Sequence, residues 1–286
     1  MKTSASNAMR VSGRRKFHNG LMAFLVGLGT LIVLGPLFII LYYVIAEGIG
    51  ALNWAFFTQA PAPPGDPGGG MLPAIVGTLI IDLLALVIGG LFGLAAGILL
   101  AEYPDHRLNP VLRLVTDVMA GVPAILMGLV AYALLVRPMG GFSAISGSVA
   151  LALLMIPIIA RSTEGMLRLI PWELREAGLA LGLPRWRVTL SLILPAARGG
   201  IITGLMLALA RAAGEAAPLL FTAFGNNSLV FNPLMAMDTL PLKLYNYAIS
   251  PYPDWHAKAW GAALVLVALI MITSLLARWA TRGRSG

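Results

Sequence analysis

Two charged residues, Arg211 and Glu215, stand four positions apart within the otherwise apolar stretch 199–221. In a continuous helix this spacing places both side chains on one face. An Arg at mid-bilayer costs about 2.5–3.5 kcal/mol on insertion scales, so such a residue is a functional candidate. Arginine suits an oxyanion because its planar guanidinium group offers two parallel hydrogen bonds and stays charged. We expect Arg211 to meet an anion crossing the membrane, with Glu215 tuning its availability. The alternative is that the two residues are a self-neutralising structural pair or hold the span to its neighbours.

Two further charged residues accompany apolar stretches. Arg161 follows the stretch 138–160, where a long basic side chain ordinarily extends to the membrane surface. Asp82 lies well inside the stretch 71–101. Because a carboxylate repels anions, we expect Asp82 to have a structural hydrogen-bond or charge partner instead of a place in an anion path.

The sequence predicts no catalytic residues, no metal site and no cofactor. No nucleophile, base and orienting group are recognisable together, as hydrolytic chemistry would require. The three histidines, His18, His106 and His256, are scattered along the chain. The chain has no cysteine, which excludes disulfides and thiolate metal ligands.

The composition is that of a membrane protein. Hydrophobic residues make up 58% of the 286 residues and charged residues 11%, against about 25% charged in a soluble domain. A membrane-spanning helix needs about 20 predominantly apolar residues. The stretches that qualify are 21–46, 71–101, 118–136 (with its helix starting near Val111), 138–160, 199–221 and 259–277. We therefore predict an all-α integral membrane protein with six transmembrane helices.

Basic residues set the expected orientation. They concentrate in the tail 1–20, the loops 102–117 and 161–198, and the C-terminus. By the positive-inside rule these segments are cytoplasmic, as are both termini. The net charge of +8 then reflects topology and contact with anionic lipid, and we expect no nucleic-acid partner. The first apolar stretch is too long for a signal peptide, so we expect an uncleaved span.

This pattern divides the chain into a basic cytoplasmic tail at 1–20, a transmembrane domain at 21–280 and a cytoplasmic tail at 281–286.

A charged, turn-rich segment, EAGLALGLPRWRVTLSLILP (176–195), separates the fourth and fifth apolar stretches. Pro171 and Glu173 suit the start of one helix, and Gly182 suits its C-terminal cap. Pro184 suits the start of a second helix. We expect two short helices joined by a fixed turn. Such an elbow is either a handle for a soluble partner or an amphipathic connector at the membrane surface.

The same segment resembles the EAA loop of binding-protein-dependent ABC-importer permeases. That motif runs Glu-Ala-Ala, three residues, Gly, nine residues, Ile, any residue, Leu-Pro. The matching residues are Glu176, Ala177, Gly182, Leu194 and Pro195, with the spacing intact. Gly178 replaces the last Ala and Leu192 replaces Ile. A glycine within a helix costs up to about 1 kcal/mol, so we expect Gly178 to loosen the first helix.

Further segments resemble one of the two permease subunits of phosphate-specific ABC importers, over roughly residues 68 to 260. These segments are 68–79, 120–129, 156–167, 173–187, 194–223 and 232–237. The resemblance implies an ABC-importer permease core of the MetI-like type at about 71–280, with a coupling elbow at 164–195. It also implies a phosphate path past Arg211 and Glu215, with Arg161 a further candidate.

The resemblance implies a set of partners as well. They are a second permease subunit (PstC-like), an ATP-binding subunit (PstB-like) that contacts Glu176 and Ala177, and a phosphate-binding protein (PstS-like) on the outer side of a bacterial inner membrane. The chain contains no GxxxxGK[ST] phosphate loop, so ATP hydrolysis is expected in a separate subunit and this chain is expected not to be an enzyme.

Other functions stay open at this point. An ABC permease for sulfate, molybdate or an amino acid would keep the elbow but lack the segment around Arg211. An ion-coupled secondary transporter or channel would need carboxylates at broken helices, for which Asp82 and Glu215 are the candidates. A regulatory membrane receptor would need no polar groups along a path.

Overall fold

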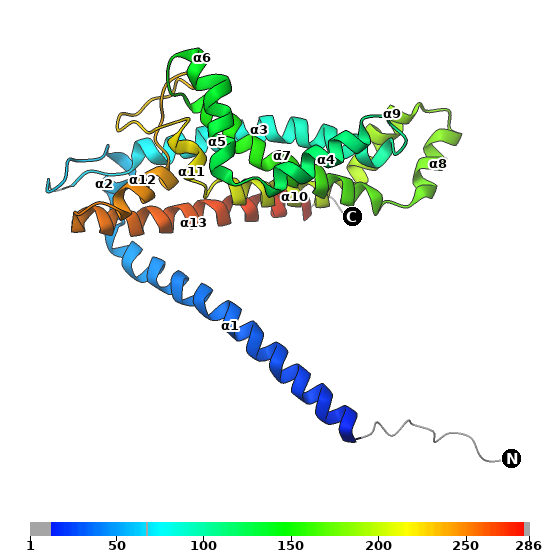
Figure 1. Ribbon diagram of the computed structural model, residues 1–286, viewed down its shortest axis with the longest axis horizontal. Coiled ribbons are helices and arrows are strands. Elements are labelled where there is room, and N and C mark those ends of the chain that lie inside the picture. Colours follow the sequence, from blue (N-terminus) through cyan, green and yellow to red (C-terminus); the bar gives the residue numbers. More distant parts are fainter. Residues whose placement is uncertain (1–12, 67, 283–286) are drawn as a thin grey trace. The chain divides into compact units, whose positions relative to one another are not determined.

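The computed structural model describes residues 13–66 and 68–282. Residues 1–12 of the predicted N-terminal tail and residues 283–286 of the predicted C-terminal tail lie outside this part of the chain. Throughout the described ranges the regular elements are helices and no strand forms, which confirms the all-α prediction (Figure 1).

The chain divides into two compact units, one up to Ala46 and one from Glu47 onward. The first consists of most of the long helix α1 (Gly13–Ala51). The helices of the second are α2 (Trp54–Thr58), α3 (Leu72–Glu102), α4 (Asn109–Gly121), α5 (Ala124–Ala131), η1 (Tyr132–Val136, a π-helix), α6 (Arg137–Met139), α7 (Ala144–Arg168), α8 (Trp172–Ala180), α9 (Arg185–Val188), η2 (Thr189–Ile193, a π-helix), α10 (Leu194–Ala212), α11 (Ala217–Leu220), α12 (Leu240–Ala248) and α13 (Pro253–Arg282).

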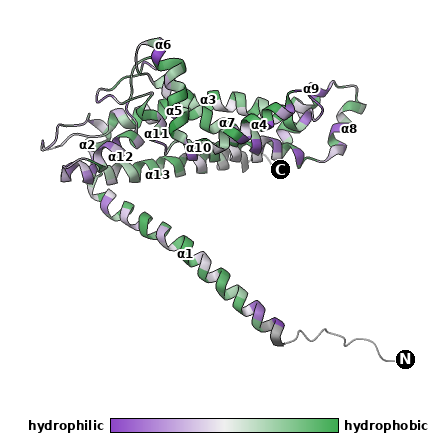
Figure 2. Cartoon of the chain, viewed as in Figure 1, coloured by the Kyte–Doolittle hydropathy of each residue, from purple (hydrophilic) through white to green (hydrophobic). Residues whose placement is uncertain are grey.

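The chain is a multi-pass membrane protein. Five of its described helices are long and apolar enough to cross a membrane, or six if the bent pair formed by α4 and α5–α6 counts as one span. Hydrophobic residues run along α3 and α13 in particular (Figure 2). Within the second unit α3, α7, α10 and α13 lie side by side, with α8 and α9 at one end and α12 at the other (Figure 1).

The predicted third span, 118–136, is not one straight helix. Helix α4 ends at Gly121, and the next helix starts at Ala124 with its axis turned by 111°. The cause is Pro123, which disfavours helical backbone at the residue before it. Val122 accordingly adopts an extended conformation, with φ −74° and ψ 132°.

The fourth and fifth spans also differ from their predicted bounds. The fourth helix starts at Ala144, where the Ser143 hydroxyl caps it by accepting from the Ser146 backbone N–H, and it continues to Arg168. The prediction 138–160 was therefore displaced at both ends. The fifth span is one continuous helix from Arg185 to Ala212, so it includes the second helix of the elbow and stops well short of residue 221.

The tightest packing joins α3 to α7 through a row of glycines on α3. Gly89, Gly93 and Gly97 are spaced four apart, and all three are buried. A Cβ atom on Gly93 would lie 2.7 Å from the Cβ of Ile159, and one on Gly97 would lie 2.6 Å from the Cβ of Thr163. Small residues at this spacing let two membrane helices approach closely.

The segment after α11 packs onto the N-terminal part of α3. The Leu240 backbone N–H donates to the Thr78 hydroxyl over 2.8 Å, and Gly77 leaves room for the Asp238 carbonyl. Asp238 and Lys243 form a buried ion pair of 2.8 Å. Burial raises the pKa of the Asp238 carboxyl group, and Lys243 counteracts part of that rise. This loop is therefore a fixed part of the fold.

We predict that Gly97→Ala destabilises the protein, whereas Gly165→Ala does not. The added methyl group would overlap Thr163 in the first variant, and overpacking costs about 1–3 kcal/mol. At Gly165, which lies on α7, a Cβ atom would meet nothing within 4 Å. Alanine there should be neutral or stabilising by up to about 1 kcal/mol. Thermal unfolding in detergent measures both, and equal melting temperatures would contradict the close α3–α7 contact.

Candidate functional site

The predicted elbow is present, and Gly182 caps its first helix. Gly182 has a φ of +76°, a conformation that residues with a side chain rarely adopt. Its N–H donates to the Leu179 carbonyl over 2.9 Å, and the Leu183 N–H donates to the Gly178 carbonyl over 3.3 Å. These two bonds make a Schellman motif, which stops α8 and sets the direction of the chain that enters α9.

Gly178, which helix propensity predicts to loosen the first helix, has a packing role in the elbow. It is buried, and a Cβ atom there would lie 2.9 Å from both Leu192 and Val188. The glycine thus allows α8 to pack closely against the second helix of the elbow. This close packing explains why glycine stands at position 178, where the motif has alanine.

The elbow is held to the membrane helices by Arg175, which the sequence analysis did not single out. Arg175 is buried on α8, and its guanidinium group makes a bidentate pair with Glu102 at the end of α3, over 2.6 and 3.2 Å. It also donates to the Leu167 and Ile170 carbonyls at the end of α7, each over 2.8 Å. One side chain therefore joins α8 to both α3 and α7.

The motif residues predicted for coupling lie at the surface of the elbow, outside this buried anchor. Glu176, Ala177 and Gly182 are exposed. Two large apolar side chains, Leu181 and Trp186, are exposed beside them, by 80% and 59%. Exposed apolar side chains among charged ones are typical of a protein-binding surface.

Pro195 has a structural consequence in the continuous helix. A proline inside a helix removes a hydrogen bond and displaces the carbonyl four residues before it. The preceding residues, Thr189–Ile193, adopt the wider π form, in which the Leu194 N–H donates to the Thr189 carbonyl. The helix therefore passes the proline without a break, and the exposed elbow is continuous with the span that ends at Ala212.

Arg211 lies in the last turn of α10 and is exposed, without an ion pair or side-chain hydrogen bond to any residue in the described ranges. It continues a row of exposed residues, Gly199, Thr203 and Leu207, spaced four apart along one side of the helix. Within the second unit, from Glu47 onward, no described residue covers this side of α10. A charged side chain on such a face requires water, an ion or another subunit beside it.

The prediction that Arg211 and Glu215 share one helix face is wrong. Helix α10 ends at Ala212, and Glu215 lies in the turn beyond, where its N–H donates to the Ala212 carbonyl over 3.0 Å. Its side chain is half-buried and makes no ion pair with Arg211. The pair is thus not self-neutralising, and Arg211 keeps its full charge exposed.

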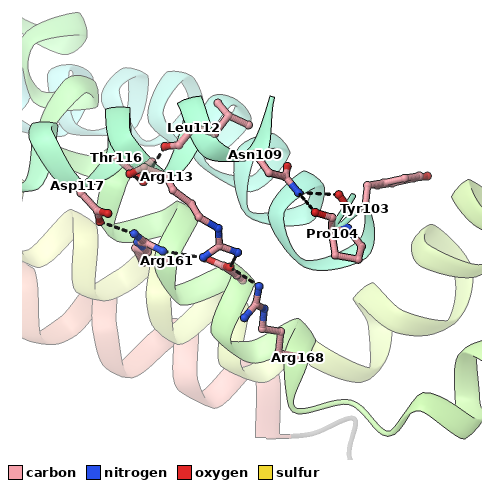
Figure 3. Close-up of polar contacts among 10 residues, drawn as sticks. Tyr103, Pro104, Asn109, Leu112, Arg113, Thr116, Asp117, Arg161 and Arg168 are labelled. Carbon is pink, nitrogen blue, oxygen red and sulfur yellow. Dashed lines mark hydrogen bonds and ion pairs between the residues drawn. The ribbon is translucent and has the colours of Figure 1, made fainter. Parts of the chain in front are cut away.

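Arg161 belongs to a different cluster, centred on the buried Glu164 of α7 (Figure 3). Glu164 accepts from Arg161, Arg113 and Arg168 over 3.2, 2.6 and 2.8 Å. Arg161 also pairs with Asp117. Because Arg113 and Asp117 are on α4, this cluster fastens α4 to α7.

The structure does not bring Arg161 and Arg211 together. Gly204 of α10 lies at about the same depth as Arg161, because a Cβ atom on Gly204 would lie 2.0 Å from the hydroxyl oxygen of Ser162, the residue after Arg161. Arg211 lies about seven residues, or about 10 Å, farther along α10. The two arginines are therefore at different depths, with Arg161 nearer the elbow.

Asp82 does not have the structural partner that was expected. It is buried within α3, and its Oδ2 makes no hydrogen bond with any residue in the ranges 13–66 and 68–282. It lines a cavity between α3, α10 and α13. In those same ranges no group of three or more His, Cys, Asp or Glu residues is placed to hold a metal ion.

Comparisons with known proteins agree with this arrangement. The family described as "Binding-protein-dependent transport system inner membrane component" matches residues 93–285. The phosphate transport system permease protein PstA of Xylella fastidiosa is 44% identical, covering 82% of each chain. PstA of Haemophilus influenzae is 40% identical, covering 92% of this chain and 94% of its own.

A more distant relative is the probable PstA of Methanocaldococcus jannaschii, 35% identical over 94% of this chain and 95% of its own. Among solved structures, an inward-facing MetNI methionine ABC transporter matches with a TM-score of 0.63 at 20% identity. The match covers 74% of this chain and 95% of that one. At this identity the likeness concerns the fold, and it confirms the predicted MetI-like architecture.

We predict that Arg175→Met strongly destabilises the elbow. The variant leaves the Glu102 carboxylate buried without its partner, and breaking a buried pair in this way costs about 3–5 kcal/mol. Arg187→Met is the matched control, since Arg187 is exposed on the same elbow. Limited proteolysis of the two purified variants should show early cleavage within residues 169–184 only for Arg175→Met. Equal cleavage rates would show that Arg175 does not hold the elbow.

Proposed function

The chain belongs to the family of binding-protein-dependent transport system inner membrane components, together with the PstA permeases, and we propose that it is the permease subunit of an ATP-driven importer of inorganic phosphate. The relatives reported above that share a third or more of its residues are all phosphate permeases, which favours phosphate over sulfate or molybdate. Because these relatives are permeases and the chain has several apolar helices, this chain is a transport subunit of a membrane complex.

The observation that most strongly supports a phosphate path is the exposed Arg211, which has no ion-pair partner in the described ranges. Arg211 offers a fixed positive charge on a side of α10 that the second unit leaves exposed. A second permease subunit packed against this face would complete a pore and place Arg211 along it. A guanidinium group binds a phosphate through two parallel hydrogen bonds, which gives selectivity for a tetrahedral oxyanion over chloride.

Arg161 would act at a later stage of the same path. Its two carboxylate partners, Asp117 and Glu164, neutralise it and join α4 to α7. Phosphate moving inward would leave Arg211 and then reach the level of Arg161, about 10 Å nearer the elbow. There the charge of Arg161 is already paired with carboxylates, so Arg161 would hold the anion less strongly than Arg211 and favour its release. Glu215, half-buried beyond the end of α10, would limit how strongly Arg211 retains phosphate.

ATP hydrolysis would take place in a separate ATP-binding subunit that docks on the elbow. Glu176, Ala177 and Gly182 would form the contact, with Leu181 and Trp186 supplying the apolar area. Arg175 would transmit the subunit's motion to α3 and α7. The continuous helix that contains Pro195 would transmit the same motion to Arg211.

The remaining partners follow from this assignment. A second permease subunit and a phosphate-binding protein would complete the importer. The basic tail, the loop 102–108, the elbow and the C-terminus would face the cytoplasm of a bacterial inner membrane, following the positive-inside rule. The loop that packs on α3 through Leu240 would then face the binding protein.

We predict that Arg211→Gln lowers phosphate uptake by about tenfold to hundredfold. A hydrogen bond to a charged group is worth about 1.5–3 kcal/mol, and the variant loses the charge while keeping a polar side chain. The measurement is uptake of radiolabelled phosphate by cells that lack their own transporter and express this chain with its partner subunits. Arg137→Gln, at another exposed arginine, is the control. Normal uptake by Arg211→Gln, with the complex assembled, would remove Arg211 from the path.

We predict that Glu176→Lys weakens association with the ATP-binding subunit by at least about tenfold. The substitution reverses a charge at the centre of the exposed motif without touching the Arg175 anchor. Asp105→Lys makes the same charge change in the exposed loop before α4 and should leave association intact. Co-purification of the ATP-binding subunit with each variant provides the measurement. If both variants retain the subunit equally, the elbow is an amphipathic connector and not the handle.

A further inference from the structure

The cluster around Glu164 holds more positive than negative charge (Figure 3). Three guanidinium groups, from Arg113, Arg161 and Arg168, converge on the Glu164 carboxylate. Asp117 supplies a second negative charge, and its partner is Arg161. Arg113 and Arg168 therefore share the single charge of Glu164, and neither has another ion-pair partner in the described ranges. One positive charge of this pair stays uncompensated.

A structural role explains Arg113 but not Arg168. Arg113 lies on α4 and Glu164 on α7, so this ion pair joins two helices. Arg168 lies four residues after Glu164 on the same helix, and its side chain is 53% exposed. Two opposite charges at this spacing on an exposed helix face stabilise it by only about 0.2–0.5 kcal/mol. The charge of Arg168 is thus available for a further partner.

The two arginines are held in position to bind one small anion together. Both bond the same oxygen of Glu164, Oε1, through their Nη2 atoms, over 2.6 and 2.8 Å. Glu164 is buried, so it fixes both guanidinium groups from the protein side. Within the ranges 13–66 and 68–282 these are the only side-chain bonds of either arginine. Their remaining N–H groups suit the several oxygens of a phosphate group.

The pair lies where the proposed phosphate path ends. Arg168 is the last residue of α7, about seven residues or about 10 Å nearer the elbow than Arg161. Phosphate that leaves Arg161 would therefore meet Arg113 and Arg168 next, at the cytoplasmic mouth of the path. The exposed carboxylate of Asp117 is already paired with Arg161, which weakens its repulsion of an anion there.

We propose that Arg113 and Arg168 form a second binding site, for a phosphate group with a single negative charge, at the cytoplasmic ends of α4 and α7. That charge matches the one that the pair leaves uncompensated. Free dihydrogen phosphate and the phosphodiester of a lipid head group both carry it. The position beyond Arg161 favours free phosphate released from the path, and in this respect the inference rests on the proposed function.

Such a site would make uptake sensitive to the phosphate already inside the cell. At low cytoplasmic phosphate the anion would leave Arg113 and Arg168 quickly, because their binding surface is open to water. At high cytoplasmic phosphate the site would stay occupied and would slow the release of the next ion. Uptake would then fall as phosphate accumulates.

Protection of individual arginines from chemical modification tests the binding. The assembled complex, in nanodiscs of zwitterionic phosphatidylcholine, is treated with phenylglyoxal, and mass spectrometry gives the rate of modification at each arginine. Compared with chloride at equal ionic strength, inorganic phosphate should slow modification of Arg113 and Arg168 at least about threefold, because the bound anion covers their N–H groups. Arg107, exposed in the loop before α4, should react equally in both salts.

The same measurement distinguishes the two sources of the phosphate group. Nanodiscs that contain anionic phosphatidylglycerol, without free phosphate, present only the lipid head group. We expect Arg113 and Arg168 to stay reactive in these nanodiscs and to become protected when inorganic phosphate is added.

One variant and a matched control locate the site. Arg168→Gln removes one charge, while Glu164 keeps Arg113 and Arg161 as partners. It should raise the phosphate concentration needed to protect Arg113 at least about tenfold, because one charged donor group is lost. Arg107→Gln removes an exposed arginine outside the cluster and should leave that concentration unchanged.

Uptake by proteoliposomes tests the consequence for transport. Vesicles that contain the complex are loaded with ATP, with or without millimolar phosphate, and the initial uptake of radiolabelled phosphate is followed. Loaded phosphate should slow uptake by the unaltered complex several-fold. In Arg168→Gln the ratio of the two rates should approach one.

Several results would overturn the proposal. Equal modification of Arg113 in phosphate and chloride, or unchanged protection in Arg168→Gln, would show that the pair is not an anion site. Protection by phosphatidylglycerol that free phosphate does not increase would assign the pair to a lipid head group and remove it from the path. Uptake that is indifferent to loaded phosphate would remove the effect on transport. The comparison of the two salts on the unaltered complex stands even if a variant fails to fold.

Failure of the proposed function would look different. A complex that imports another oxyanion, and in which phosphate still protects Arg113 and Arg168, would refute phosphate as the substrate and leave the second site in place. A complex that imports phosphate without this protection would keep the proposed function and refute the site.

Discussion

The position of the elbow on the membrane helices depends on one buried interaction, in which Arg175 binds Glu102 and the Leu167 and Ile170 carbonyls at the end of α7. The pair is nearly inaccessible to water, with side-chain exposures of 9% and 7%. Five N–H donors in a fixed plane allow one guanidinium group to bond to two helices at once, which a lysine could not do with the same geometry. Because of this anchor, α8 is a rigid extension of the membrane helices. A force applied to the exposed side of α8 is then passed to α3 and α7, instead of being absorbed by a flexible loop.

The continuous helix from Arg185 to Ala212 is the second connection between the elbow and the membrane. It begins in the elbow, passes Pro195 by adopting a π turn, and ends with Arg211 on an uncovered face. The helix thus connects a surface suited to a soluble partner with a charge suited to an oxyanion. Along the helix axis, the cluster around Glu164 lies between the elbow and Arg211, and it holds α4 to α7. The charged groups therefore lie at separate depths along the spans.

Local sequence signals predicted the parts of the structure that depend on neighbouring residues. The cap at Gly182 is such a case, because a glycine in a left-handed conformation after a helix needs only its own turn. The bend at Pro123 and the row of glycines ending at Gly97 carried equally local signals, which the search for apolar stretches passed over. The pairing of Arg175 with Glu102 had no such signal, since the two residues are 73 positions apart and either could have faced water. The separation of Glu215 from the face of Arg211 did carry a local signal, because Gly214 and Pro218 follow the last turn of α10 and are typical of a helix end.

We expect the elbow and the end of α10 that carries Arg211 to move as one rigid helix. The chain has no cysteine, so two introduced cysteines would be its only labelling sites. Arg187→Cys and Leu207→Cys place one spin label each at exposed positions of this helix. Their separation should be about 30 Å, from 1.5 Å per residue. Pulsed electron paramagnetic resonance on the assembled importer, with and without trapped nucleotide, measures it directly. A rigid helix gives the same narrow distance distribution in both states. A distance that shifts or broadens when nucleotide is trapped would mean that the helix bends between the elbow and Arg211, and rigid transmission would be contradicted.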